Sequence, residues 1–236
     1  MNLASHDGRS LRTGGITLVE ILVVVAVVSL LWALLLPALA GSAHTVRRVK
    51  CVNNLRQLGL CAAIYADENE AAFPPRGRPF WMEELRPCYQ DLSVLECPSD
   101  PVAASFITSA VESYMAPRSY FINGWNDYFN ERLSADGFTA YMDYSLRAGM
   151  PEGNVSAPSE TILFGEKLPL SQHIHMDLLQ GDGNDLEEVD HARHSGGANY
   201  SFVDGSARFL RSGECISPVN LWAVTAFWRQ QAVSAP

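Results

Sequence analysis

Glu20 is the first residue of this sequence whose position calls for a chemical explanation. It lies in the stretch GGITLVEILVVVAVVSLLWALLLPALAG, residues 14–41, where almost every other side chain is apolar or small. A carboxylate inside a membrane is costly unless a partner neutralises it, and carboxylates found there usually have a function. The position of Glu20 therefore predicts a contact with a positively charged group.

A second group of residues could bind a metal ion. Residues 173–194, HIHMDLLQGDGNDLEEVDHARH, contain four histidines, six carboxylates and one arginine. A solvated loop without an ion is the simplest interpretation of this stretch. Oxygen ligands of this density also suit Ca²⁺, although Leu186 occupies a ligand position of the EF-hand template. The first calcium candidates are Asp182, Asn184, Asp185 and Asp190. A transition metal is the further alternative, on His173, His175, His191 and His194.

The five cysteines, at positions 51, 61, 88, 97 and 215, include no CxxC pair and no other zinc-ligand spacing. On one helix, Cys51 and Cys61 would lie about 15 Å apart along the axis, too far to bond to each other. Cys88 and Cys97 are the only pair close enough in the sequence to suggest a local disulfide. The odd number leaves at least one thiol free.

Sequence motifs of catalysis are missing, since the chain has no GxSxG, Walker, HExxH or GxGxxG motif. We therefore expect no enzymatic activity, and no cofactor other than the calcium ion considered above. From Asp67 to the C-terminus there are 24 acidic and 11 basic residues. Such a balance argues against binding of nucleic acids, because few cations are present to displace the counterions of a phosphate backbone.

A long N-terminal helix is expected to position Glu20. Residues 21–43 carry no charge and would extend about 34 Å as a helix, enough to span a bilayer. A secretory signal peptide is the alternative, because PALAGSA offers small residues for cleavage. We expect one helix of about 50 residues, transmembrane over 16–43 and amphipathic over 44–72, with a kink at Pro37. The amphipathic part is predicted by apolar residues every three or four positions, at Val46, Val49, Val52, Leu55, Leu58, Ala62 and Tyr65.

Residues 73–236 predict an α+β domain. The segments SYFIN, TILFGE and NYSFV are rich in aromatic and β-branched residues, as strands are. Asp204-Gly205 is a favoured turn dipeptide and would join NYSFV to ARFLR in a hairpin. Strands that follow a long helix favour an antiparallel sheet laid across it. His194 would then lie about 20 Å from Asp204, at the other end of a strand, as a loop residue that bonds to nearby backbone.

Two stretches resemble known proteins. GGITLVEILVVVAVV resembles the cleavage and methylation signal of type IV prepilins and type II secretion pseudopilins, with Glu20 at the glutamate of that signal. HSGGANYSFVDG resembles the H-x9-DG motif of pilin-like proteins that are abundant in planctomycetes and related bacteria. The matching residues of that motif are His194, Asp204 and Gly205.

The resemblance implies a leader peptide at residues 1–15, cleavage between Gly15 and Ile16 by a prepilin peptidase, and N-methylation of Ile16. It implies a pilin-like fold, in which the long helix packs on an antiparallel sheet. The implied function is that of a structural subunit in a pseudopilus or pilus-like filament of a type II secretion or related system. Glu20 would contact the N-terminal amine of a neighbouring subunit. Calcium binding by major pseudopilins supports the calcium site by analogy.

The expected partners are the prepilin peptidase, other pilin or pseudopilin subunits and an inner-membrane assembly platform. The expected location is the bacterial inner membrane, crossed once, with the N-terminus in the cytoplasm and residues 73–236 outside it, in the periplasm or in a surface filament. The alternative function belongs to another class: a membrane-anchored extracytoplasmic protein that binds a ligand, a metal or a carbohydrate and uses a prepilin signal.

Overall fold

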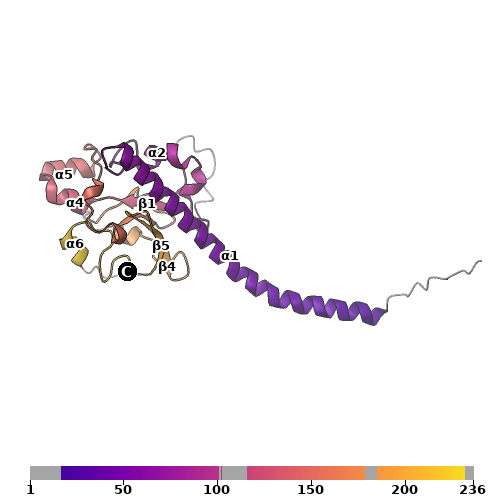
Figure 1. Ribbon diagram of the computed structural model, residues 1–236. Coiled ribbons are helices and arrows are strands. Elements are labelled where there is room, and N and C mark those ends of the chain that lie inside the picture. Colours follow the sequence, from indigo (N-terminus) through magenta and orange to yellow (C-terminus); the bar gives the residue numbers. More distant parts are fainter. Residues whose placement is uncertain (1–16, 101, 103–115, 179–184, 232–236) are drawn as a thin grey trace, which may run out of the picture. The chain divides into compact units, whose positions relative to one another are not determined.

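The structure, a computed structural model, describes residues 17–100, 102, 116–178 and 185–231. The chain divides into two units, residues 1–43 and 44–236, which are described separately. Helix α1 (Leu18–Glu68) runs from the first unit into the second as one element of 51 residues (Figure 1). The long N-terminal helix predicted from the sequence is therefore confirmed, and it ends at Glu68 rather than at residue 72.

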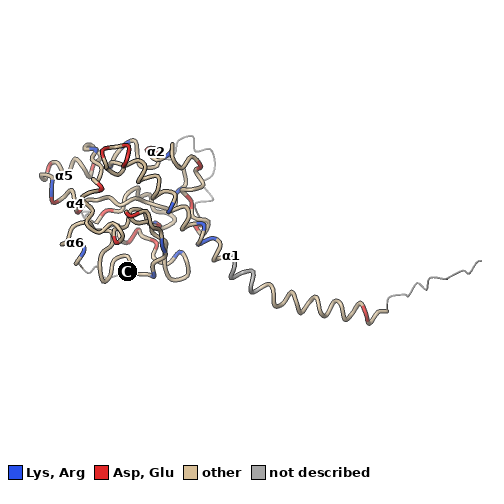
Figure 2. Tube along the Cα trace, viewed as in Figure 1, with Lys and Arg blue, Asp and Glu red and all other residues tan. Residues whose placement is uncertain are grey.

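The first unit contains the apolar part of α1. Over the 19 residues Leu18–Leu36 the mean hydropathy is 2.8 and 0% of the span is buried. Glu20 lies in the first turn of α1, and Figure 2 shows a stretch without charged residues after the start of this helix. By length and composition this helix can cross a membrane, and a secretory signal sequence would meet the same criterion. The side chains of residues 37–43 lie outside the described part, so the kink at Pro37 stays a prediction.

Thr17 and Glu20 form the N-terminal cap of α1. The backbone N and the Oγ1 of Thr17 donate to Glu20 Oε2 at 2.8 and 2.9 Å, and Glu20 N donates to Thr17 Oγ1 at 3.3 Å. This reciprocal pattern is a capping box, which satisfies two backbone donors that a helix start would otherwise leave without partners. Glu20 therefore has a local structural role as well as its expected role between subunits.

In the second unit, one face of α1 is buried from Cys51 onward. Leu55, Leu58 and Ala62 are fully buried, as their helical spacing predicts. Val46 and Val49, predicted for the same stripe, are 66% and 50% exposed. The spacing of apolar residues shows which side of a helix is apolar, but not how far along the helix its partner extends.

A five-stranded sheet forms the centre of the second unit. Its order is β3-β1-β2-β4-β5, and neighbouring strands are antiparallel except β1 and β3, which are parallel. All three predicted strands and the predicted hairpin of β4 and β5 are confirmed, while the purely antiparallel sheet is not. The strands are β1 (Tyr120–Asn123), β2 (Ile162–Glu166), β3 (His175–Met176), β4 (Gly197–Phe202) and β5 (Ala207–Arg211).

Short helices and 3-10 turns connect the strands and follow α1. The helices are α2 (Trp81–Glu84), α3 (Arg86–Tyr89), α4 (Asn126–Arg132), α5 (Ala135–Met142) and α6 (Ala226–Gln230). The 3-10 turns are η1 (Leu92–Leu95), η4 (Glu152–Asn154), η5 (Pro158–Glu160) and η6 (Asp185–Glu188). The expected combination of a long helix with a mostly antiparallel sheet is thus present.

Two apolar cores lie on opposite faces of the sheet. Side chains alternate along β1, so that Tyr120 and Ile122 join the core under α1 and Phe121 joins the other. Trp222, which is fully buried, packs edge-on against Phe121 with ring centroids 5.4 Å apart. The sheet is therefore covered by α1 on one face and by the C-terminal segment on the other, and residues between α1 and the sheet are shielded from water.

Candidate functional site

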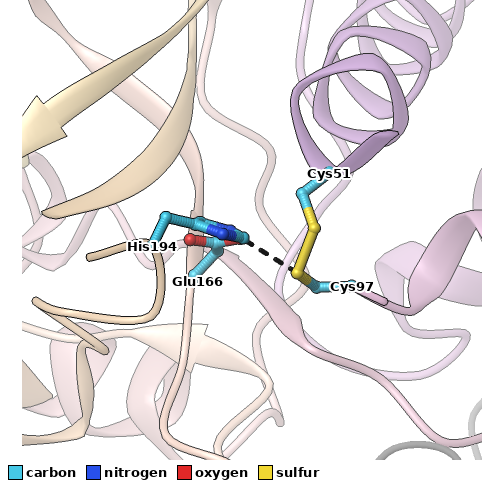
Figure 3. A group of neighbouring side chains, drawn as sticks. All are labelled: Cys51, Cys97, Glu166 and His194. Carbon is cyan, nitrogen blue, oxygen red and sulfur yellow. Dashed lines mark hydrogen bonds and ion pairs between the residues drawn. A yellow bond between two sulfur atoms is a disulfide. The ribbon is translucent and has the colours of Figure 1, made fainter. Parts of the chain in front are cut away.

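His194, the histidine of the H-x9-DG stretch, lies in a buried cluster of side chains. Its Nε2 is 2.8 Å from Glu166 Oε1 and 3.5 Å from Cys97 Sγ. Cys97 is bonded to Cys51, which completes the group shown in Figure 3. His194 was expected to be a loop residue that bonds to backbone, and its backbone N does donate to Gly197 O at 2.9 Å. Its ring, however, is buried against a carboxylate.

The sheet positions two members of this cluster. Glu166 is the last residue of β2, and β2 pairs with β4, the strand that begins just after His194. The backbone N of Asn199 in β4 donates to Glu166 Oε2 at 2.9 Å and orients the carboxylate. Between His194 and β4 the chain turns through two left-handed residues, Ser195 and Gly196, at φ 58° and 96°. The turn allows the ring to face Glu166.

The two cysteines of the cluster come from α1 and from the segment after η1. The structure contains two disulfides, Cys51–Cys97 and Cys61–Cys88, and the remaining thiol, Cys215, is buried. The predicted local bond between Cys88 and Cys97 is therefore wrong. Each disulfide ties α1 to the segment that folds back along it, because the chain reverses after α1. Separation in the sequence does not measure distance across such a reversal.

Asp204 and Gly205, the second half of the H-x9-DG stretch, form the turn of the β4–β5 hairpin, as predicted. Gly205 has a φ of 80°, and its N donates to Phe202 O at 3.0 Å. Asp204 Oδ1 accepts from Ser206 N at 2.9 Å. His194 and Asp204 lie at the two ends of β4, so the motif combines a cluster residue and a turn.

Two cationic residues are adjacent in the sequence to members of the cluster. The side chain of Arg193, next to His194, is 2% exposed and lies 2.9 Å from Asp190 Oδ2 through Nε and 3.4 Å from Asp100 Oδ2 through a terminal nitrogen. Lys167, next to Glu166, donates to Ser171 O. Burial, and then the charge of Arg118, lower the pKa of Lys167 to about 8. Arg193 is thus engaged by two carboxylates and Lys167 by a backbone carbonyl.

The calcium candidates are only partly described. The carboxylate of Asp190 is bound to Arg193 and to Ala192 N, the latter at 3.1 Å. Asp182 and Asn184 lie outside the described residues, and for Asp185 the described part is its backbone at the start of η6. The calcium site stays a prediction, although one of its four candidate ligands is already engaged by an arginine.

The four histidines do not come together. His191 Nε2 lies 3.2 Å from Leu186 O and its Nδ1 lies 3.7 Å from Cys215 Sγ. His175 is buried beside Arg76, and burial lowers its pKa to about 3. In the part of the chain that is described, groups of three or more ligating side chains are found at Cys51, Cys97, Glu166 and His194. The four-histidine metal site is therefore wrong, because histidines close in sequence face different surroundings.

Glu166 was missed by the sequence analysis. The available signal was a carboxylate at the end of TILFGE, a strand otherwise made of residues suited to a core. The expected processing residues, Gly15 and Ile16, lie outside the described part, and Glu20 lies exposed in the first turn of α1. A scan against protein-family models found no match to this chain, and searches of the curated proteins and of the solved structures also found none.

Proposed function

We propose that the protein is a structural subunit of a pilin-like filament, a pseudopilus or pilus of a type II secretion or related system. The observation that carries this proposal is an exposed apolar helix whose first turn contains a carboxylate, which also forms the helix cap. Along Leu18–Leu36 0% of the span is buried, and Glu20 lies in its first turn. Because so much apolar surface requires either lipid or other apolar helices around it, this segment suits a subunit that passes from membrane to filament.

Glu20 supplies the assembly contact in this proposal. Both bonds from Thr17 go to Oε2 of Glu20. Since a carboxylate has about four lone-pair positions, it can accept further bonds while it caps its own helix. Cleavage after Gly15 would create an amine at Ile16, and the same amine on a neighbouring subunit is the cation that Glu20 requires.

The second unit supports an extracytoplasmic location. It contains two disulfides, and disulfides persist in oxidising compartments such as the periplasm and the cell surface. The proposed orientation has the N-terminus in the cytoplasm, where the prepilin peptidase and the assembly platform act, and the acidic domain outside. In this proposal the subunit acts by packing and performs no covalent chemistry itself.

The test is the chemical identity of the mature N-terminus. The full-length chain is produced in bacteria with and without a prepilin peptidase, and the membrane fraction is analysed by intact-mass and N-terminal peptide mass spectrometry. The expected product begins at N-methylated Ile16 and depends on the peptidase. A Gly15→Val variant is the matched control and is expected to retain its leader. A product that begins after PALAGSA would show a secretory signal peptide and overturn the proposal.

The alternative, a membrane-anchored protein that binds a small ligand or a carbohydrate, receives no comparable support from the described residues. A groove of about 470 Å³ lies beside α6. Its two charged residues, Glu160 and Arg229, are paired with each other at 3.0 Å rather than directed toward a ligand. The groove is lined by Ser156, Glu160, Pro218, Val219, Ala226, Arg229 and Gln230.

A further inference from the structure

The buried cluster around His194 contains the donor atoms of a metal site. The four ligand atoms of Cys51, Cys97, Glu166 and His194 all lie within 4.8 Å of one another. The four residues are between 0% and 6% exposed. The carboxylate and the imidazole are paired with each other at 2.8 Å, and the two sulfur atoms lie beside them as a disulfide.

The chemistry of this donor set selects Zn²⁺. Zinc prefers tetrahedral sites of thiolate sulfur, imidazole nitrogen and carboxylate oxygen, and closed sites with four protein ligands are structural. From the usual zinc–ligand lengths, a tetrahedral site places sulfur and nitrogen about 3.6 Å apart and nitrogen and oxygen about 3.3 Å apart. Here Cys97 Sγ and His194 Nε2 are 3.5 Å apart, and Nε2 and Glu166 Oε1 are 2.8 Å apart.

We propose that the reduced chain binds one Zn²⁺ between Cys51, Cys97, Glu166 and His194, and that the Cys51–Cys97 disulfide replaces the metal when the chain is oxidised. The Cα atoms of the two cysteines are 5.0 Å apart, so after reduction both sulfurs stay within reach of one ion. The site is independent of the filament assembly proposed above; it forms while the chain is reduced, and the disulfide forms in an oxidising compartment.

The zinc-bound form and the disulfide form interconvert with a dithiol as the reductant and a disulfide as the oxidant. A dithiol reductant transfers two electrons and two protons to the Cys51–Cys97 bond and leaves two thiols. Zn²⁺ binding then releases the two thiol protons, because the ligand is the thiolate. In the opposite direction, a disulfide oxidant takes up two electrons together with two protons from water and becomes a dithiol, the sulfur–sulfur bond of Cys51 and Cys97 forms again and Zn²⁺ leaves.

The surroundings of the cluster also suit a metal. Asn199 N donates to Glu166 Oε2 at 2.9 Å, and Glu166 Oε1 lies 2.8 Å from His194 Nε2. Such outer contacts orient metal ligands and raise affinity.

The second disulfide provides a matched control within the same chain. Cys61–Cys88 also ties α1 to the following segment, but neither cysteine belongs to the group of ligating side chains found among the described residues. Reduction exposes two thiols at each place. The proposal requires that the thiols at Cys51 and Cys97 form the zinc site and that those at Cys61 and Cys88 do not contribute.

The test uses the full-length protein in detergent, reduced with a phosphine under argon and titrated with Co²⁺ and then Zn²⁺. The expected result is one equivalent of Co²⁺ per chain, with a thiolate-to-cobalt absorption band and the strong visible bands of a tetrahedral ion, displaced by Zn²⁺. The oxidised protein is expected to show neither band. The proposal would be overturned if the reduced chain showed no thiolate-to-cobalt band with Co²⁺. It would also be overturned if Zn²⁺ did not raise the melting temperature of the reduced chain.

Variants assign the ligands. Cys61→Ser/Cys88→Ser is expected to retain both cobalt bands, and Cys51→Ser/Cys97→Ser is expected to lose them. His194→Ala and Glu166→Gln keep all cysteines, so their oxidised forms report folding by circular dichroism. After reduction each is expected to bind Zn²⁺ at least about 100-fold more weakly, since loss of outer contacts alone costs up to that factor. If both variants kept the Zn²⁺ affinity of the unchanged chain, neither residue would be a ligand and the proposal would be overturned.

Discussion

The two roles assigned to Glu20 can be separated by a single substitution. A capping box accepts either Glu or Gln at its third helical position. Glu20→Gln therefore keeps the bonds with Thr17 that the structure shows and removes the negative charge. The matched control is Thr17→Ala, which removes the cap and keeps the charge.

The expected magnitudes differ clearly between the two variants. Loss of an N-cap costs about 1 kcal/mol at the helix start. In the proposed filament the ion pair would be enclosed by apolar helices, where removal of one partner leaves the other charge uncompensated and costs about 3 to 5 kcal/mol. At about 1.4 kcal/mol per factor of ten, Glu20→Gln should weaken addition of a subunit to the filament by at least about 100-fold. Thr17→Ala should weaken it by less than about 10-fold.

The assay measures processing and assembly in the same cells. Processed protein in the membrane is quantified by mass spectrometry, and incorporated protein is quantified in sheared and sedimented filaments. Both variants are expected to insert and to be processed as the unchanged protein is, while Glu20→Gln alone is absent from filaments.

Normal incorporation of Glu20→Gln would refute the charge-pairing argument. If Thr17→Ala were as defective as Glu20→Gln, the glutamate would act through the helix cap instead. If Glu20→Gln failed to reach the membrane, its role would lie in insertion, which the proposed pairing does not predict.

Three further predictions concern the second unit and are measured by urea unfolding of the full-length protein in detergent. Cys61→Ser/Cys88→Ser should lower the free energy of unfolding by about 3.5 kcal/mol, because the bond closes a loop of sequence separation 27 in the unfolded chain; an unchanged value would contradict this entropy argument. His175 titrates at a pKa of about 3 in the folded protein against 6.5 unfolded, so the unfolded chain gains the proton first as the pH falls. Its contribution should be complete above pH 6.5 and decrease by about 2 kcal/mol from pH 7 to pH 5, and His175→Gln should flatten the pH profile. Asp177→Asn should cost about 3 kcal/mol or more because it leaves Arg76 buried without its bidentate carboxylate, and a cost below about 1 kcal/mol would contradict this.

The elements of the fold could be predicted from the sequence because their signals are local. The helix Leu18–Glu68 follows from an uncharged run and from apolar spacing, and Thr17 and Glu20 are close enough to cap it. The hairpin turn at Asp204-Gly205 likewise depends on adjacent residues. Strand β3 was missed because His175 and Met176 alone show no period.

The arrangement of the cluster could not be predicted in this way. Cys51, Cys97, Glu166 and His194 come from four separate segments and meet only after α1 has been covered by the sheet. Cys88 and Cys97 are near each other in the sequence and nevertheless bond to different partners.

The sequence by itself thus determined the elements: an apolar helix that contains Glu20, an amphipathic continuation and a hairpin. Their patterns arise from residues within one or two turns of each other, where the separation in the sequence sets the arrangement in space. Only the tertiary structure decided which cysteines pair, that His194 is buried and that Glu166 is its partner. Those contacts depend on where the chain reverses and which strands pair, and residue spacing does not record either.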